Sequence, residues 1–261
     1  MEKRKLGILG SGYLGEIIAK AWKDGYLEEY ELVGIYGRNP QTTVALAQKY
    51  GCTACASMEE LLLRRPDFIA EAASVEAIRD YAGQILRSGS SLIVLSIGAF
   101  ADADFYGQIR RTAAESGTRV YIASGAVGGF DVLRTLCLMG SAKTNFEAMK
   151  APKSLRNTPL FAEHLMTDTE PSQVFDGNTR EAIGLLPTKV NVAVATALAS
   201  AGPENVSMQI QSIPGFVGDE HRIHAEIDGF RADLDIYSGT AAIAGWSVVA
   251  VLRNIVSPVV F

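Results

Sequence analysis

Histidine and cysteine are scarce in this chain of 261 residues, which has three of each. So small and odd a number of cysteines cannot form a disulfide framework, and it is typical of a protein from a reducing compartment. Cys52 and Cys55 form a C-x-x-C pair, but no second pair and no nearby histidine supplies the further ligands that zinc needs. We therefore expect no metal site.

An excess of positive charge and long apolar runs are also missing. The chain has 24 basic and 29 acidic residues, a net charge of -5 at pH 7, and no basic stripe. Nucleic acids and anionic membranes both require a basic surface, so neither is expected as a partner. No apolar run reaches the roughly 20 residues that span a bilayer. The first strand begins without room for a targeting peptide, and we expect a cytoplasmic protein.

Glycine is concentrated in the first turn. A short apolar run predicts a buried strand, and Gly10, Gly12 and Gly15 then follow in the G-x-G-x-x-G spacing as a helix begins. Gly10 allows the tight turn, Gly12 lets the backbone approach a pyrophosphate, and Gly15 lets helix and strand pack closely. The amide groups at the helix start, at Tyr13 and Leu14, then face the phosphates. This stretch predicts a dinucleotide site.

The end of the second expected strand, 31–36, bears on which dinucleotide binds. In this fold an acid about twenty residues past the glycines holds the free 2′-hydroxyl of NAD. The chain has Gly37 and Arg38 there instead, an arrangement that suits the 2′-phosphate of NADP. The alternative is that Arg38 is a solvated loop cation. We expect both NADP and NAD as cofactors, with Ala73, at the end of another strand, beside them.

The order of strands and helices predicts the fold class. Strands alternate with helices five times in about 120 residues, which indicates an α/β fold with a Rossmann-like doubly wound parallel sheet. From Ser124 the pattern becomes that of a second, α+β domain. The apolar segment 240–255 is expected to be a helix that returns to the first domain. We expect a dinucleotide-binding domain at 1–123 and 238–261, and a substrate-binding and oligomerisation domain at 124–237.

Acid–base chemistry near neutral pH would use a histidine. His164 lies in a polar stretch typical of a surface. His221 and His224 have an odd spacing, so on a strand they face opposite sides. His221 is nearer the glycine-containing loop 215–218, and positions near loops more often carry function. The residues alone do not decide between the two.

Several further segments occur in a fixed order after the glycine-rich start: Glu71-Ala72-Ala73-Ser74, Ser96-Ile97-Gly98-Ala99-Phe100-Ala101-Asp102, Ser124-Gly125-Ala126-Val127-Gly128-Gly129, Pro152-Lys153-Ser154-Leu155 and Leu186-Pro187-Thr188-Lys189-Val190-Asn191-Val192-Ala193. Together they resemble the L-aspartate dehydrogenase family from residue 1 to about 236. The resemblance implies that Ala126 and Asn191 contact the nicotinamide half of the cofactor. It also implies that the catalytic histidine is His221, and that the chain forms a homodimer or larger homo-oligomer.

The resemblance further implies the reaction. A hydride would pass between NAD(P) and the Cα of a small amino acid, L-aspartate, giving iminosuccinate and then oxaloacetate and ammonia. Lys153 is a candidate to bind a carboxylate of this amino or oxo acid, and Ser124 is a second candidate for substrate binding. A solvated lysine is the alternative interpretation of Lys153.

Three positions depart from the family pattern. Gly37 replaces an acid, Asp219 replaces an asparagine, and Tyr237-Ser238-Gly239-Thr240-Ala241 replaces an Asn-Pro-Lys-Thr-like stretch. The first departure concerns the cofactor and the other two concern the substrate. They leave open an oxidoreductase acting on a sugar or oxo acid, although the Glu-Lys-Pro-like motif common in sugar enzymes is missing. A dinucleotide-binding sensor without turnover is also open, because fold alone does not exclude it.

Overall fold

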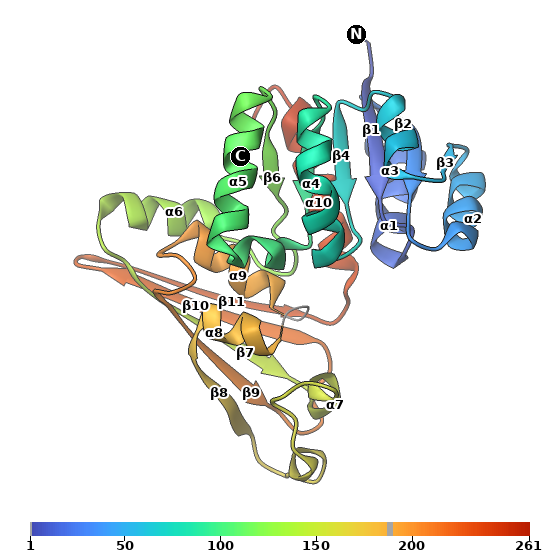
Figure 1. Ribbon diagram of the computed structural model, residues 1–261. Coiled ribbons are helices and arrows are strands. Elements are labelled where there is room, and N and C mark those ends of the chain that lie inside the picture. The colour runs from blue at the N-terminus through green and yellow to red at the C-terminus, as the bar shows by residue number, and fades with distance from the viewer. Residues whose placement is uncertain (1, 187–189) are drawn as a thin grey trace. The chain divides into compact units, whose positions relative to one another are not determined.

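The computed structural model describes residues 2–186 and 190–261, which form two compact units. One unit runs to Gly125 and includes Ala242–Phe261, and the other comprises Ala126–Ala241 (Figure 1). Both boundaries lie a few residues beyond the expected 124 and 238. The Pro187-Thr188-Lys189 part of the last segment quoted for the resemblance lies outside the described residues.

A six-stranded parallel sheet forms the centre of the first unit, in the order β3-β2-β1-β4-β5-β6. Its strands are β1 (Arg4–Leu9), β2 (Tyr30–Tyr36), β3 (Ala54–Cys55), β4 (Phe68–Glu71), β5 (Ser91–Val94) and β6 (Val120–Ile122). This confirms the predicted doubly wound parallel sheet and adds β3, a strand too short to be recognised from its sequence. The strand order reverses between β1 and β4, where sheets of this kind bind ligands at their carboxyl ends.

Helices of the first unit begin at local capping signals. They are α1 (Tyr13–Lys23), α2 (Pro40–Tyr50), α3 (Met58–Leu63), α4 (Val75–Arg87), the 3₁₀ turn η1 (Ile97–Ala101), α5 (Ala103–Glu115) and α10 (Ala242–Val256). The side chains of Asn39, Ser57, Ser74 and Asp102 each accept a hydrogen bond from an amide in the first turn of the helix that follows. These caps fix where α2, α3, α4 and α5 begin.

Helix α10 completes the core of the first unit, although it lies at the other end of the chain (Figure 1). The Tyr30 hydroxyl donates a 2.7 Å hydrogen bond to the Leu252 carbonyl oxygen, and Gly245 packs so closely on Ile17 that a Cβ would lie 3.0 Å from it. Val248 and Leu252 are buried with the residues of β1. None of the helices in the described part of the chain has the length and hydropathy that crossing a membrane requires.

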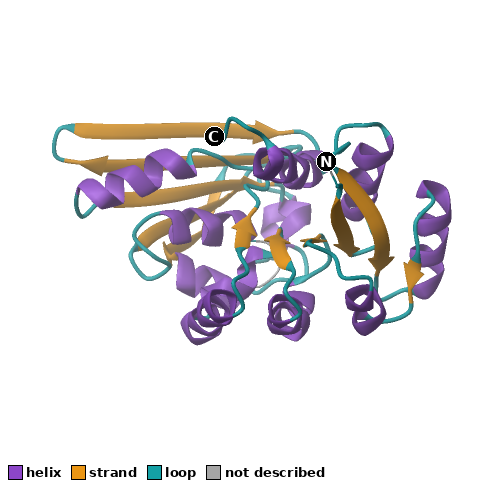
Figure 2. Ribbon diagram, turned by 90° about the horizontal axis from the view of Figure 1, so that it is seen from above, coloured by secondary structure: helices purple, strands orange, loops and turns teal. Residues whose placement is uncertain are grey.

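The second unit is built on a five-stranded mixed sheet in the order β11-β10-β7-β9-β8, with β7 and β9 parallel and the other pairs antiparallel. Its strands, drawn in orange like all strands in Figure 2, are β7 (Lys143–Lys150), β8 (Ser172–Asn178), β9 (Val206–Ser212), β10 (Asp219–Ile227) and β11 (Phe230–Ser238). Its helical segments are α6 (Phe130–Met139), α7 (Pro152–Leu155), η2 (Glu163–Met166), α8 (Thr179–Leu185) and α9 (Asn191–Ala199). The predicted α+β second domain is therefore confirmed in kind.

One face of this second sheet carries the unit's hydrophobic core. Alternate residues of β7, β9 and β10 pack there against α6, α8 and α9; among them are Phe146, Ala148, Met208, Ile210 and Ile223. The period of two follows from the alternation of side chains along a strand. It also decides which polar residues of these strands are buried.

Candidate active site

The turn between β1 and α1 has glycine where the backbone leaves no room for a side chain. Gly10 has a φ of +122°, and a Cβ there would lie 2.4 Å from the carbonyl oxygen of Ala72. A Cβ on Gly15 would lie 2.1 Å from the carbonyl oxygen of Gly10. Both positions are closed by backbone atoms, so these two glycines serve the close packing of turn, strand and helix.

Gly12 differs from its neighbours because nothing lies within 4 Å of the place where its Cβ would stand. It is the extended N-terminal cap of α1, and no side chain there accepts a hydrogen bond from the first amide groups of the helix. Tyr13 is exposed and Leu14 is half-buried. Helix amides without a side-chain cap, beside open space, suit an anionic group such as a pyrophosphate. The residues present therefore fit NAD(P).

The loop after β2 packs directly on this turn. A Cβ on Gly37 would lie 2.3 Å from the hydroxyl oxygen of Ser11, which itself lies 3.0 Å from the hydroxyls of both Thr42 and Thr43. Arg38 follows Gly37 and is exposed, and the sequence has no carboxylate between it and Thr43. One cation among hydroxyl groups suits a phosphate group better than an uncharged ribose hydroxyl.

The end of β4 is held by a buried carboxylate that sequence analysis missed. Glu71 is fully buried, and it accepts hydrogen bonds from the amides of Ala73, Leu95 and Ser96 and from the Ser96 hydroxyl, at 2.7 to 3.1 Å. Burial raises the pKa of Glu71. These bonds fix the loops after β4 and β5, including Ala73, at the carboxyl edge of the sheet. The available signal was a charged residue ending an otherwise apolar strand.

The expected nicotinamide contacts lie in the second unit, and Ser124 lies in the first. Ser124 and Ala126 are half-buried on either side of Gly125, whose amide donates to the Ser247 hydroxyl of α10 at 3.0 Å. Asn191 is the first residue of α9 and is also half-buried. The roles expected for these three residues remain predictions.

The three histidines have different surroundings. His221 and His224 face opposite sides of β10, as their odd spacing predicts. The side chain of His224 is 39% exposed, and its Nδ1 lies 2.6 Å from a carboxylate oxygen of Asp233, which raises the pKa of His224. His164 is exposed beside Asp168. His221 alone is buried, at 3% exposed, with its ring centroid 5.5 Å from that of Phe146.

The surroundings of His221 favour the neutral form of its imidazole. Burial, together with the positive charge of Lys150, lowers its pKa to about 4, although Asp219 acts in the opposite direction. Its Nδ1 is buried and has no hydrogen-bond partner among the residues that the structure describes. At pH 7 this side chain is uncharged and has a nitrogen lone pair with which to accept a proton.

Lys150 lies on the same face of the sheet as His221. It ends β7, is 6% exposed, and its Nζ lies 3.6 Å from Oδ1 of Asp219. In the pairing of β7 with β10, His221 lies opposite the buried Ala148. The side chains of Lys150, Asp219 and His221 therefore all point to the helix-covered side of the sheet. The structure thus brings together a buried lysine, an aspartate and a neutral histidine.

Lys153, the predicted carboxylate ligand, is exposed on the short helix α7. Sequence analysis chose it and missed Lys150. The available signal was the phase of β7, in which Lys150 continues the alternation of the buried residues Phe146 and Ala148. A lysine in phase with a buried stripe is unusual, because an unpaired charge is costly to bury.

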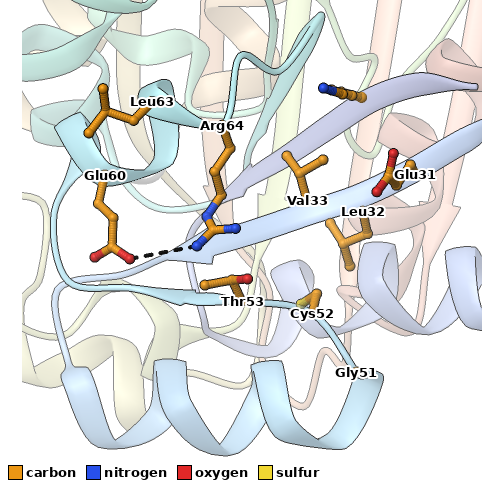
Figure 3. A pocket seen from close by; sticks show the side chains of 10 residues that line it. Glu31, Leu32, Val33, Gly51, Cys52, Thr53, Glu60, Leu63 and Arg64 are labelled. Carbon is orange, nitrogen blue, oxygen red and sulfur yellow. Dashed lines mark ion pairs between the residues drawn. The ribbon is translucent and has the colours of Figure 1, made fainter.

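A pocket of about 850 Å³ lies at the amino ends of β1 and β2 (Figure 3). It is lined by Lys5, Glu31, Leu32, Val33, Gly51, Cys52, Thr53, Glu60, Leu63 and Arg64. Ligands of doubly wound sheets bind at the opposite, carboxyl edge, so this is not the dinucleotide site. Its Cys52 is a free thiol whose pKa burial raises to about 11, which makes it a poor nucleophile. Within the described residues, no group of three or more His, Cys, Asp or Glu could hold a metal ion.

The lowered pKa of His221 predicts a pH dependence of stability. Its value of about 4 in the folded chain lies below the ordinary 6.5, so between these values the unfolded chain binds more protons and the free energy of unfolding rises with pH. We expect a loss of up to about 3 kcal/mol from pH 6.5 to 4. Urea unfolding at several pH values should show this slope in the natural chain and a shallower one in His221→Gln. Equal slopes in the two proteins would contradict it.

Two protein families match this chain. Residues 131–255 match the aspartate dehydrogenase C-terminal family, and residues 10–123 match the NAD binding domain of homoserine dehydrogenase. An L-aspartate dehydrogenase from Methanococcus maripaludis strain C5 is 31% identical, and one from Methanocaldococcus jannaschii is 27% identical. Each alignment covers 98% of this chain and 98% of the relative.

Solved structures agree with these matches. The aspartate dehydrogenase of Thermotoga maritima has a TM-score of 0.79 and 26% sequence identity, covering 99% of both chains. GenD2 from gentamicin A biosynthesis, solved in complex with NAD, has a TM-score of 0.57 at 12% identity, covering 98% of this chain and 87% of its own. The second likeness concerns the fold alone.

Proposed function

Because this chain belongs to the L-aspartate dehydrogenase family, we propose that it oxidises L-aspartate with NAD(P), yielding iminosuccinate and then oxaloacetate and ammonia. It is an oxidoreductase that acts on a CH–NH₂ group. The observation that carries the mechanism is His221, a neutral histidine on the buried face of β10. A sugar dehydrogenase is not favoured, since the sugar-enzyme relatives share only the fold.

When bound, NAD(P) would supply the acceptor for the hydride that leaves Cα, and this chain's residues would carry out the remaining steps. The open turn at Gly12 and the first amides of α1 would hold the pyrophosphate. Hydride transfer moves no proton, so the substrate ammonium and the water that adds to the imine must lose their protons to a base. His221 accepts a proton in the oxidative direction and returns it in reductive amination. Aspartate, water and NAD(P)⁺ thus become oxaloacetate, ammonium, NAD(P)H and one released proton.

A panel of 2-oxo acids with ammonia and reduced dinucleotide tests this function. Oxaloacetate should be reduced fastest, as followed by the absorbance of NADH or NADPH, and sugars and polyols should not be oxidised in the reverse assay. Faster turnover of another oxo acid would assign a different amino acid. If no compound turned over although a dinucleotide bound, the chain would be a sensor.

For the choice of cofactor, we expect NADPH to be accepted at least as well as NADH. Arg38 and the hydroxyls of Ser11 and Thr42 offer a charge-assisted site for the 2′-phosphate, and the sequence from Arg38 to Thr43 contains no acid. Arg38→Ala should raise the KM for NADPH about tenfold or more, equivalent to ~1.4 kcal/mol, and leave that for NADH unchanged. Arg110→Ala, an exposed arginine on α5, is the matched control. If NADPH is already tenfold worse in the natural enzyme, Arg38 is a solvated cation.

We also propose that the enzyme is cytoplasmic and assembles as a homodimer or larger homo-oligomer. Its cysteines are free thiols, as is usual in a reducing compartment. β11 is an edge strand of the second unit, and Phe230 and Tyr237 on it are large exposed hydrophobic residues, which supports an oligomer interface there. The second unit would then serve both substrate binding and assembly. Light scattering coupled to gel filtration measures the oligomeric state.

A further inference from the structure

One row of residues across the second unit's sheet is polar, although it lies on the face that carries the core. Lys150 on β7 is paired with Ser212 on the neighbouring strand β9, so their side chains lie on the same face of the sheet. Neighbouring strands of a sheet are about 4.8 Å apart. On the other side of Lys150 lies Asp219 of β10. His221 belongs to the next row on this face, beside Ala148. Three of these polar residues are buried: Ser212 at 2%, His221 at 3% and Lys150 at 6% exposed.

On this face, two buried polar atoms have no hydrogen-bond partner among the described residues: the Ser212 hydroxyl oxygen, in the same row as Lys150, and Nδ1 of His221, in the next row. Buried polar atoms of folded proteins are nearly always paired, and an exception needs an explanation. Both atoms flank a buried ammonium group. A hydroxyl donor, an ammonium and an imidazole on one buried patch form a place for a ligand with negatively charged acceptor atoms.

The contact between Lys150 and Asp219 is a long one. Their closest atoms lie 3.6 Å apart, beyond the length of a good hydrogen bond, and the Asp219 side chain is 54% exposed. Asp219 therefore attracts the ammonium without binding it tightly. A carboxylate has two oxygens, so it can accept one hydrogen bond from Nζ of Lys150 and one from the hydroxyl of Ser212 at the same time.

We propose that Lys150 and Ser212 bind a carboxylate group of the amino or oxo acid substrate and so hold that acid beside His221. This assignment rests on the proposed function and adds to it the residues that recognise the acid. In this assignment the buried Lys150, and not the exposed Lys153, binds the negative charge of the substrate. Asp219 competes with the substrate carboxylate for the Lys150 charge and tunes the affinity downward.

The test compares Lys150→Met with Lys143→Met, the same change at the exposed lysine that begins β7. The KM for oxaloacetate should rise 30-fold or more in Lys150→Met and stay within twofold in Lys143→Met, with the Kd of the dinucleotide unchanged in both. Ser212→Ala should raise this KM three- to tenfold. Asp219→Asn should lower it, because the competing anion is gone.

A second measurement does not depend on turnover. Succinate carries two carboxylates but no amino or oxo group, and binding it should raise the melting temperature of the natural enzyme and of Lys143→Met. Lys150→Met should show no such rise. If Lys150→Met keeps both its succinate response and its KM, the assignment is wrong and Lys150 is a structural ion-pair partner.

Two further outcomes are separable. If Lys150→Met does not fold, the variants Ser212→Ala and Asp219→Asn decide. Weaker succinate binding in Ser212→Ala together with tighter binding in Asp219→Asn would support the assignment. Unchanged succinate binding in both would overturn it. If the natural enzyme turns over no acid, the proposed function fails. The succinate measurement then still supports or overturns the carboxylate site.

Discussion

His221→Ala should lower kcat by about 10² to 10⁴, the usual contribution of a well-placed proton-transfer group. The buried imidazole is neutral at pH 7, and no other histidine lies on that face of β10 among the described residues. The Kd of the dinucleotide should stay within about twofold, because the glycine turn that binds it belongs to the other unit. Steady-state kinetics and a fluorescence titration of NADPH measure the two quantities.

His224→Ala is the matched control for this substitution. His224 lies on the same strand, is partly exposed and is engaged by Asp233, so its loss should leave kcat within about threefold. The pH–rate profile should lose one limb in His221→Ala and keep both in His224→Ala. If the two variants exchanged these phenotypes, His224 would be the acid–base residue and the proposed mechanism would be wrong.

Gly12→Val should abolish dinucleotide binding without unfolding the chain. The Cβ of valine would enter space in which no protein atom lies within 4 Å, so the fold loses nothing, but the backbone is no longer open to a pyrophosphate. A dinucleotide at 100 times its Kd stabilises the natural protein by about 2.7 kcal/mol, and this gain should vanish in the variant. Differential scanning calorimetry with and without NADPH measures it.

Gly184→Val tests whether this loss is specific. Gly184 is an exposed glycine of α8 that also has open space around it, and valine is tolerated in a helix better than glycine. This variant should keep the full stabilisation by NADPH. Full stabilisation of Gly12→Val as well would mean that the pyrophosphate lies elsewhere.

The glycine turn expected to bind the dinucleotide could be recognised because its signals are local. A strand, a turn and a helix follow one another within a few residues at Gly10, Gly12 and Gly15. Gly10 and Gly15 are each closed by backbone atoms of that turn or of the residues after β4, whereas Gly12 borders open space. The parallel sheet follows from the alternation of strands and helices for the same reason. The sequence also shows Arg38 near the end of β2, where NAD-binding folds have an acid. The role of Arg38 in binding the cofactor stays a prediction.

The acid–base half depends on strand pairing, which a sequence does not state. Period two separates His221 from His224, but only the pairing of β10 with β7 shows which of them is buried. The same pairing brings Lys150 to Asp219, and a neighbour on β9 brings Ser212 to Lys150. These contacts join residues more than sixty positions apart, so the sequence does not reveal them. Lys153 was therefore predicted as the carboxylate ligand because it lies in a recognisable segment, whereas the buried lysine is Lys150.

The return of α10 to the first unit also sets an order of events during synthesis. The hydrogen bond from Tyr30 to Leu252 joins positions 222 residues apart, so at ribosomal rates about 10 to 45 s separate the two partners. Until then, the apolar surface of α1 that Gly245 and its neighbours cover is open to chaperones and to aggregation. The second unit is contiguous and can fold earlier. All of the second unit, including His221, is thus synthesised before α10, which completes the first unit.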